Sequence, residues 1–120
     1  MGNNVRVEVD LMDTVNFAMQ QNGIPLIRKI NIFNDSQEVC RDITVKVNFE
    51  PEFAGSYSHE VKMINPGACI EISPVEIVLS TEFLYSLTEK MIGCIEVAIF
   101  LGEEKIGELR RNIEILACDQ

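Results

Sequence analysis

Residues 43–50 read Ile-Thr-Val-Lys-Val-Asn-Phe-Glu, so apolar side chains occupy the odd positions and polar side chains the even ones. A β-strand with one buried face and one solvated face has this period of two. The same alternation recurs over residues 5–11, 57–63 and 75–79, and it gives the sole histidine, His59, the inward parity of a partly buried structural residue. Four such stretches predict an all-β fold.

Three further stretches are less regular. Residues 15–19 are predicted to form a short strand that turns at Asn22-Gly23 into a strand over residues 24–33. Residues 92–101 are apolar on both parities except at Glu96, which predicts a central strand covered on both sides or lying at an interface. Glu96 itself should lie at an edge, in an interface or beside an Arg or Lys. The inward parity shifts within residues 105–116, which predicts a β-bulge near Gly107.

The breaks between these stretches complete the predicted fold. Asn65-Pro66-Gly67 suits a type II turn, and Pro74 should lie at a sheet edge or where the chain changes sheets. Ser80 is a capping residue before apolar positions with helical spacing. We therefore predict one domain over residues 1–120, an immunoglobulin-like β-sandwich of about seven to nine strands with a short helical crossover near residues 81–89.

Charge narrows the classes of partner. Ten basic residues stand against nineteen acidic ones, which gives a net charge of −9. Such a chain repels phosphate backbones and anionic membranes, so we expect neither direct nucleic-acid binding nor membrane binding. The N-terminus has no basic region followed by an apolar one, and no apolar run is long enough to span a bilayer. These features predict a cytoplasmic protein, unless a secretion signal has been removed.

The cysteines are Cys40, Cys69, Cys94 and Cys118. Reduced, mostly buried thiols are favoured over two disulfides, and a metal site is disfavoured because there is no C-x-x-C pair and only one histidine. Cys40 and Cys94 have about the separation of an antibody-type bridge, but the tryptophan that packs on such a bridge is absent. We expect no cofactor.

No motif for catalysis is present. His59 is the obvious general base, yet its strand parity favours a structural role, and no nucleophile elbow, phosphate-binding loop or zinc-protease motif occurs. The carboxylates fall mostly at outward strand positions or in turns, where solvation explains them. Asn34-Asp35-Ser36 matches the glycosylation sequon, which matters only in a secreted protein. The sequence therefore predicts that this domain is not an enzyme.

Several short pieces, in this order and spacing, resemble a known family. They are Val15-Asn16-Phe17-Ala18, Gln21-Asn22, Pro25, Asn34, Pro51-Glu52-Phe53-Ala54, Leu79-Ser80, Phe83-Leu84, Leu87-Thr88-Glu89 and Leu116-Ala117. Together they resemble the N-terminal segment of very large bacterial proteins of the superfamily 1 helicase type, some with a restriction-endonuclease-like region near the C-terminus. The resemblance implies one domain excised from a longer parent protein with helicase or ATPase activity, and it transfers no catalytic residue to this chain.

We therefore expect a non-catalytic interaction or positioning module. Its candidate surfaces are the loops at residues 52–57 and 102–105 and the strand at residues 92–101, and the residues singled out are Phe53, Tyr57, Glu96, Phe100 and Glu103. The expected partners are other domains of the parent protein or a separate protein, with a weak homodimer through residues 92–101 as a further option. The alternative is an extracellular or envelope sandwich that binds a ligand or carbohydrate.

Overall fold

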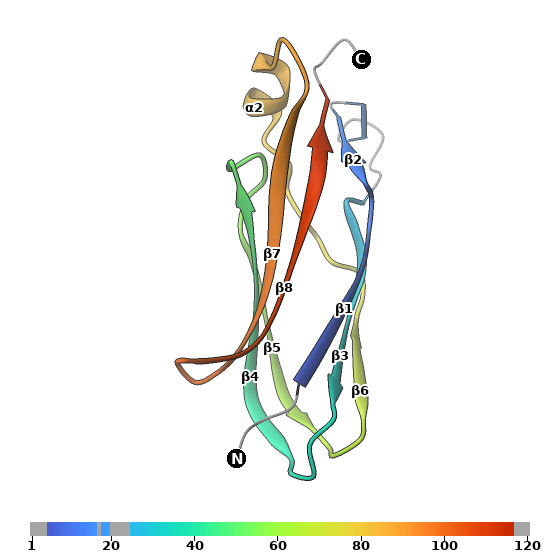
Figure 1. Ribbon diagram of the computed structural model, residues 1–120, viewed down its shortest axis with the longest axis vertical. Helices are drawn as coiled ribbons and strands as arrows, with labels where there is room; N and C mark the ends of the chain where they lie inside the picture. Colours follow the sequence, from blue (N-terminus) through green and yellow to red (C-terminus); the bar gives the residue numbers. More distant parts are fainter. Residues whose placement is uncertain (1–4, 17, 20–24, 117–120) are drawn as a thin grey trace.

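Two β-sheets pack face to face in the computed structural model, which describes residues 5–16, 18–19 and 25–116 (Figure 1). The molecule is elongated, with extents of 50 × 22 × 19 Å, and the strands run along its long axis. The strands are β1 (Val5–Leu11), β2 (Thr14–Val15), β3 (Ile27–Asn34), β4 (Cys40–Glu50), β5 (Tyr57–Ile64), β6 (Cys69–Ile72), β7 (Met91–Leu101) and β8 (Glu104–Ile115), and the helix is α2 (Thr81–Ser86).

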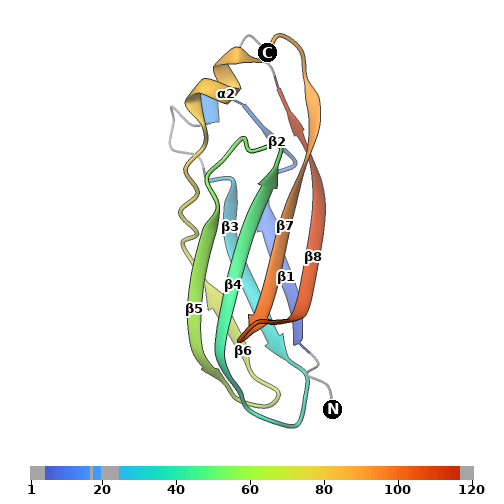
Figure 2. The ribbon, with the colours of Figure 1, turned by 90° about the vertical axis from the view of Figure 1, so that its left-hand side faces the viewer.

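The order of the strands is that of an immunoglobulin-like sandwich. One sheet has the order β1-β3-β6 and the other the order β2-β8-β7-β4-β5 (Figure 2). In immunoglobulin domains a sheet that contains strands A, B and E faces one that contains G, F and C; β1-β3-β6 and β8-β7-β4 occupy these places. The chain passes from the first sheet to the second through α2. The predicted sandwich with a short helical crossover is confirmed.

The core lies between the sheets, and the alternation of β4 supplies its centre. Ile43, Val45 and Val47 are fully buried, whereas Lys46 and Asn48 on the opposite face are exposed. Full burial of an aliphatic side chain of this size contributes about 1.5–3 kcal/mol. Inward residues of β1, β3, β7 and β8 face these side chains in one continuous cluster. The period-two pattern is therefore what holds the two sheets together.

A β-bulge brings the two sheets together along one side of the sandwich. Ile99 pairs with Gly107 and Phe100 with Lys105, so Ile106 is the extra residue of β8. A Cβ at Gly107 would lie 3.3 Å from the carbonyl oxygen of Val5, the first residue of β1. The missing side chain thus allows β8 to approach β1 closely. The bulge predicted near Gly107 is confirmed.

The crossover closes the α2 end of the sandwich. Ser80 caps α2, because its Oγ accepts a hydrogen bond from the Phe83 amide at 3.2 Å. The helix ends at Ser86, three residues before the predicted limit. Before it, residues 75–79 keep the predicted inward parity, but they form no ladder beyond one bridge from Leu79 to Ala54. The predicted strand over residues 75–79 is therefore wrong, and Pro74 lies where the chain changes sheets, as predicted.

One other predicted strand needs correction, and one strand was missed. The strand predicted at residues 15–19 is only Thr14–Val15, because Asn16 Oδ1 accepts a hydrogen bond from the Met19 amide at 2.8 Å and Ala18 and Met19 turn helical. The turn predicted at Asn22-Gly23 lies outside the described residues. Conversely, β6 was not predicted, since four residues are too few to show a period.

His59 has the predicted inward parity, but the prediction that it is partly buried is wrong. β5 is the edge strand of its sheet, and both it and β4 interrupt their alternation at the same level. β4 buries Cys40 and then Ile43, while their partners on β5, Ile64 and Val61, are the buried pair there. His59 lies beyond this interruption at the rim of the core and is exposed.

The end of the sandwich opposite α2 is organised around Asn34. This residue is fully buried, and its Nδ2 donates hydrogen bonds to the carbonyl oxygens of Glu38 (2.8 Å) and Ile64 (2.9 Å). Its Oδ1 accepts from the Ser36 amide at 3.0 Å and from the Ser36 hydroxyl at 2.6 Å. The predicted type II turn lies alongside, because Gly67 has φ of +74° and donates its amide to the Asn34 carbonyl.

Candidate interaction surface

The outward face of β7 is the centre of the candidate surface. The strand lies between β8 and β4, and its odd residues from Gly93 to Ile99 are buried against the core. Its even residues point the other way: Glu96 has Asn48 on one side and Arg110 on the other, and Ala98 has Lys46 and Glu108. The strand predicted to be covered on both sides is therefore central, but in the described chain a layer of charged side chains lies over its outer face.

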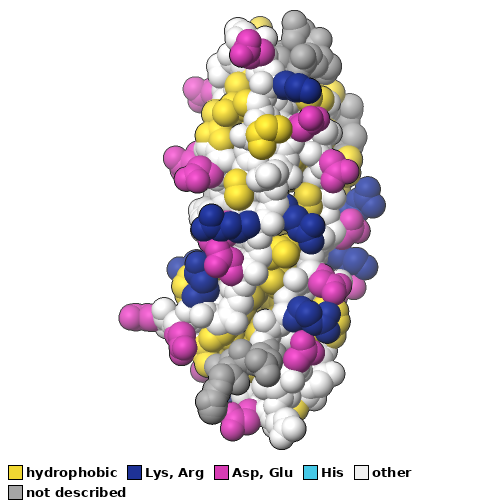
Figure 3. Space-filling model, in the orientation of Figure 1, with side chains coloured by type: hydrophobic (Ala, Val, Ile, Leu, Met, Phe, Trp, Pro, Cys, Tyr) yellow, Lys and Arg dark blue, Asp and Glu magenta, His cyan; other side chains and the backbone are white. Residues whose placement is uncertain are grey.

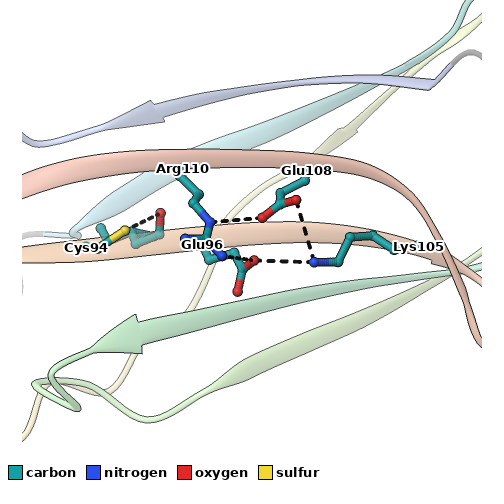
Figure 4. A network of polar contacts seen from close by, with 6 residues as sticks. Cys94, Glu96, Lys105, Glu108 and Arg110 are labelled. Atoms are coloured by element: carbon teal, nitrogen blue, oxygen red, sulfur yellow. Dashed lines mark hydrogen bonds and ion pairs between the residues drawn. The ribbon is translucent and has the colours of Figure 1, made fainter.

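Four charged residues form a connected network on this face (Figure 4). Glu96 Oε2 lies 3.3 Å from Arg110 Nη2 and 3.5 Å from Lys105 Nζ. Glu108 completes the network, with Oε2 2.9 Å from Arg110 Nε and Oε1 3.6 Å from Lys105 Nζ. The prediction that Glu96 would be paired with Arg or Lys is confirmed.

The network biases the protonation of its members. The pKa of Glu108 lies below its usual range. The largest cause is a hydrogen bond with the Glu96 carboxyl, and the next is a hydrogen bond from Arg110. Hydrogen bonding to Glu108 and the charge of Glu96 raise the pKa of Arg110. Glu96 is the most enclosed member, with 23% of its side chain exposed, whereas 66% of the Arg110 side chain is exposed. Both shifts favour the charged forms of Glu108 and Arg110, and salt screens the attraction between such exposed groups.

Phe100 and Lys46 extend the surface toward β4. The Lys46 ammonium lies 5.1 Å from the centre of the Phe100 ring, which is a cation–π geometry. Ala98, between them and the network, is only 2% exposed although it faces outward. The aliphatic stems of the long charged side chains thus cover apolar parts of β7. The sequence had predicted that a second layer or an interface would cover them.

Two depressions lie beside the network. The first, of about 110 Å³, is lined by Asn48, Phe49, Glu50, Cys94, Glu96 and Arg110. The second, of about 320 Å³, is lined by Lys46, Asn48, Ser56, Tyr57 and Ser58. Burial, and then the charge of Glu76, raise the pKa of Tyr57, so its hydroxyl remains a hydrogen-bond donor over the physiological range.

The structure brings together only some of the five predicted surface residues. Glu96 and Phe100 share the outer face of β7, and half-buried Tyr57 lines the second depression. Glu103 is exposed in the turn between β7 and β8. The prediction that Phe53 lies on the interaction surface is wrong, because it is fully buried and packs edge-on against Phe49 with ring centres 5.2 Å apart. Its loop turns inward there, so Phe53 belongs to the core.

The cysteines only partly follow the prediction. Cys40, Cys69 and Cys94 are all unbonded, but only Cys40 is buried, Cys69 is exposed and Cys94 is intermediate. The antibody-like pairing fails on geometry: Cys40 begins β4 and Cys94 lies opposite Glu50 at the far end of that strand, about 33 Å away. The immunoglobulin bridge joins strands B and F, which here are β3 and β7.

Sequence reasoning missed the role of Asn34 and the exposed apolar residues near α2. The sequon at Asn34 drew attention to glycosylation, but the side chain is enclosed and donates both amide hydrogens, so it is inaccessible to that modification in the folded domain. Val78 and Ile92 are 76% and 58% exposed. Their outward parity in residues 75–79 and 92–101 was the signal that could have found them.

The candidate surface is not accompanied by a metal cluster or a membrane-spanning helix among the described residues. Within the described part of the chain no three His, Cys, Asp or Glu side chains converge as metal ligands, and no helix has the length and apolar character needed to cross a membrane. Neither the family models nor the curated proteins compared with this sequence match it. The resemblance to helicase-type proteins therefore stays a prediction.

Proposed function

We propose that this domain is a non-catalytic interaction module that positions a partner within a larger bacterial, helicase-like DNA-processing protein of the cytoplasm. The surface proposed for this role is the outer face of β7 and β8, defined by Glu96, Phe100, Lys105, Glu108 and Arg110. The helicase context rests on the sequence resemblance alone. The interaction role rests on the geometry of this face.

The observation that carries the proposal is the four-residue ion network at the centre of the larger sheet. Each of the four side chains forms ion pairs with two others, as Glu96 does with Lys105 and Arg110. Side chains that are already ordered lose less conformational entropy when a partner binds. Both signs of charge lie within a few ångströms, and such a mixture suits a protein surface with complementary charges better than a phosphate backbone.

The first test is a binding measurement in trans. The remaining domains of the parent protein would be titrated into the present chain by calorimetry, with Arg110→Ala and Glu96→Gln as test variants. Glu71→Gln is the matched control, because Glu71 faces outward on the smaller sheet. We expect weaker binding for the two test variants and an unchanged affinity for the control. Equal affinity for all four proteins would overturn the assignment of this face.

A second test concerns the class of function. The reading frame beyond codon 120 should continue into a helicase core, and a stop codon there would refute that context. A rate of nucleotide hydrolysis or DNA cleavage that a point mutation in this chain abolishes would refute the non-catalytic role. Titration of thiols in the unfolded protein should find four, whereas two disulfides would support the secreted, ligand-binding alternative.

A further inference from the structure

The α2 end of the sandwich carries the most exposed large hydrophobic residues of the described chain. Val78, Tyr85 and Ile92 are 76%, 67% and 58% exposed, ahead of Met63 at 42% and Val39 at 37%. Val78 lies just before α2, Tyr85 lies on it, and Ile92 is the second residue of β7, whose start lies beside the helix in Figure 1. Figure 3 shows hydrophobic side chains gathered over this upper part of the molecule.

These residues are not needed to complete the core at that end. Leu79 and Leu84, their neighbours in sequence, turn inward and are buried, and Phe53 fills the space between them and β7. Single exposed hydrophobics are common on protein surfaces. Three of them lie at one end of this small domain, and it is their combination with charge that makes this end a candidate contact surface.

The charge at this end is predominantly negative. The two segments that build it, residues 50–56 and 73–92, contain one basic residue, Lys90, which pairs with Glu114 at 3.7 Å. The same segments contain five glutamates, and all of them are exposed: Glu50, Glu52, Glu76, Glu82 and Glu89. Toward the other end the charges are mixed, since Arg41, Lys62 and Lys105 lie there together with acids such as Glu60 and Glu104. The α2 end therefore combines apolar contact area with a local negative potential.

We propose that this α2-end surface, formed by Val78, Tyr85 and Ile92 with Glu52, Glu76 and Glu82, docks a Lys/Arg-rich segment of a partner protein that carries apolar side chains between its charges. Charge complementarity selects this occupant: a second copy of the same end would bring glutamates against glutamates, and nucleic acid or an anionic membrane would be repelled. The inference rests on the proposed interaction function, but it uses a different surface from the β7–β8 ion network.

Salt concentration and apolar contact area affect the binding affinity of such a site separately. Attraction between exposed charges weakens with ionic strength, since the Debye length falls from about 10 Å at 0.1 M salt to about 3 Å at 1 M. Contacts of Val78 and Ile92 do not depend on charge in this way. Binding should therefore weaken as salt rises, and the apolar variants should weaken it further at every salt concentration.

The probe is a fluorescein-labelled synthetic peptide of twelve residues that alternates Lys with Leu and Phe, titrated with the chain and followed by anisotropy. We expect saturable one-to-one binding that Val78→Ser with Ile92→Ser weakens about tenfold. Glu52→Gln with Glu82→Gln should reduce its salt dependence. A peptide of the same pattern with Glu in place of Lys should not bind.

The matched controls lie at the other end of the domain. Val39→Ser with Met63→Ser removes two exposed hydrophobics there, and Glu60→Gln with Glu104→Gln removes two exposed acids on that half of the larger sheet. Each control pair should change the affinity less than about twofold. Equal losses for test and control pairs, no binding of the Lys peptide, or self-association through this end would overturn the proposal. Because the ion-network variants should leave peptide binding unchanged, its failure is distinguishable from failure of the proposed function.

Discussion

The two ends of the sandwich are built on opposite principles. At one end Asn34 is buried and satisfies backbone groups of three loop and strand segments, with Gly67 completing a tight turn beside it. At the other end the contacts are apolar, from Phe53 and Leu84 inside to Val78 outside. The polar groups around Asn34 are hydrogen-bonded to one another and are therefore not available to a partner. The α2 end, in contrast, keeps exposed apolar side chains and charges. Both ends therefore hold the fold together inside, but only the α2 end also presents apolar side chains outside.

The largest expected effect is at the inner side of the α2 end. Phe53→Ala removes a fully buried ring that packs against Phe49, and it should lower the free energy of unfolding by about 3–5 kcal/mol. Urea denaturation followed by circular dichroism measures the loss. Phe53→Leu keeps most of the volume and should lose markedly less. A loss below about 1 kcal/mol for Phe53→Ala would show that this end does not depend on apolar packing.

The opposite end should be sensitive to a polar deletion. Asn34→Ala removes the amide that donates to the carbonyl oxygens of Glu38 and Ile64, of which Glu38 keeps only the Ser36 hydroxyl, and should lower the free energy of unfolding by about 2–4 kcal/mol. Asn31→Ala is the matched control, because Asn31 lies three residues away on the outer face of the same strand. The same denaturation experiment should detect little change for it. Similar losses for both variants would contradict the role given to Asn34.

Some features of the fold could be predicted from the sequence. Strict alternation over residues 43–50 predicted a sandwich strand correctly, because inward and outward positions follow from a single period. The bulge at Gly107 and the pairing of Glu96 were predictable as well, since a slipped parity and an isolated carboxylate each require a local solution. In those cases the sequence pattern and the physical requirement coincide.

The position of Phe53 and the role of Asn34 could not be predicted this way. Phe53 lies in the loop after β4, where no period tells which way the side chain points. Asn34 ends β3 at the inward parity of Ile30 and Ile32, but a period does not show which buried groups its amide binds. Phe53 turns inward because the loop after β4 pairs with Leu79 of the crossover. His59 misled for a related reason, because inward parity buries Val61 on the edge strand β5 but leaves His59, two residues away, exposed.

A smaller effect compares one glycine from each end. Gly67 has φ of +74°, and an alanine there should lower the free energy of unfolding by about 1 kcal/mol even though no atom lies within 4 Å of the new Cβ. Gly55, at the α2 end, has no positive φ, and its nearest neighbour would be the Val78 carbonyl oxygen at 3.9 Å. Gly55→Ala should therefore be neutral or slightly stabilising. Thermal unfolding of both variants tests the pair, and equal losses would contradict the contrast.

The smallest effect concerns the ion network, which lies between the two ends. Because the folded state lowers the pKa of Glu108, the unfolded chain binds more protons as the pH falls through the ordinary range of a glutamate, about 4.3. The contribution of this carboxylate is complete above that pH and is lost as the pH falls through its lowered folded value. Glu108→Gln should therefore shift the urea midpoint slightly at pH 7, and the difference from the parent protein should shrink as the pH falls through the lowered folded pKa of Glu108. Asp35→Asn offers a control outside the network, where Asp35 pairs only with Arg6. A difference that grew toward acid pH would mean that Glu108 is held protonated in the folded state, and the network could not then order the outer face of β7.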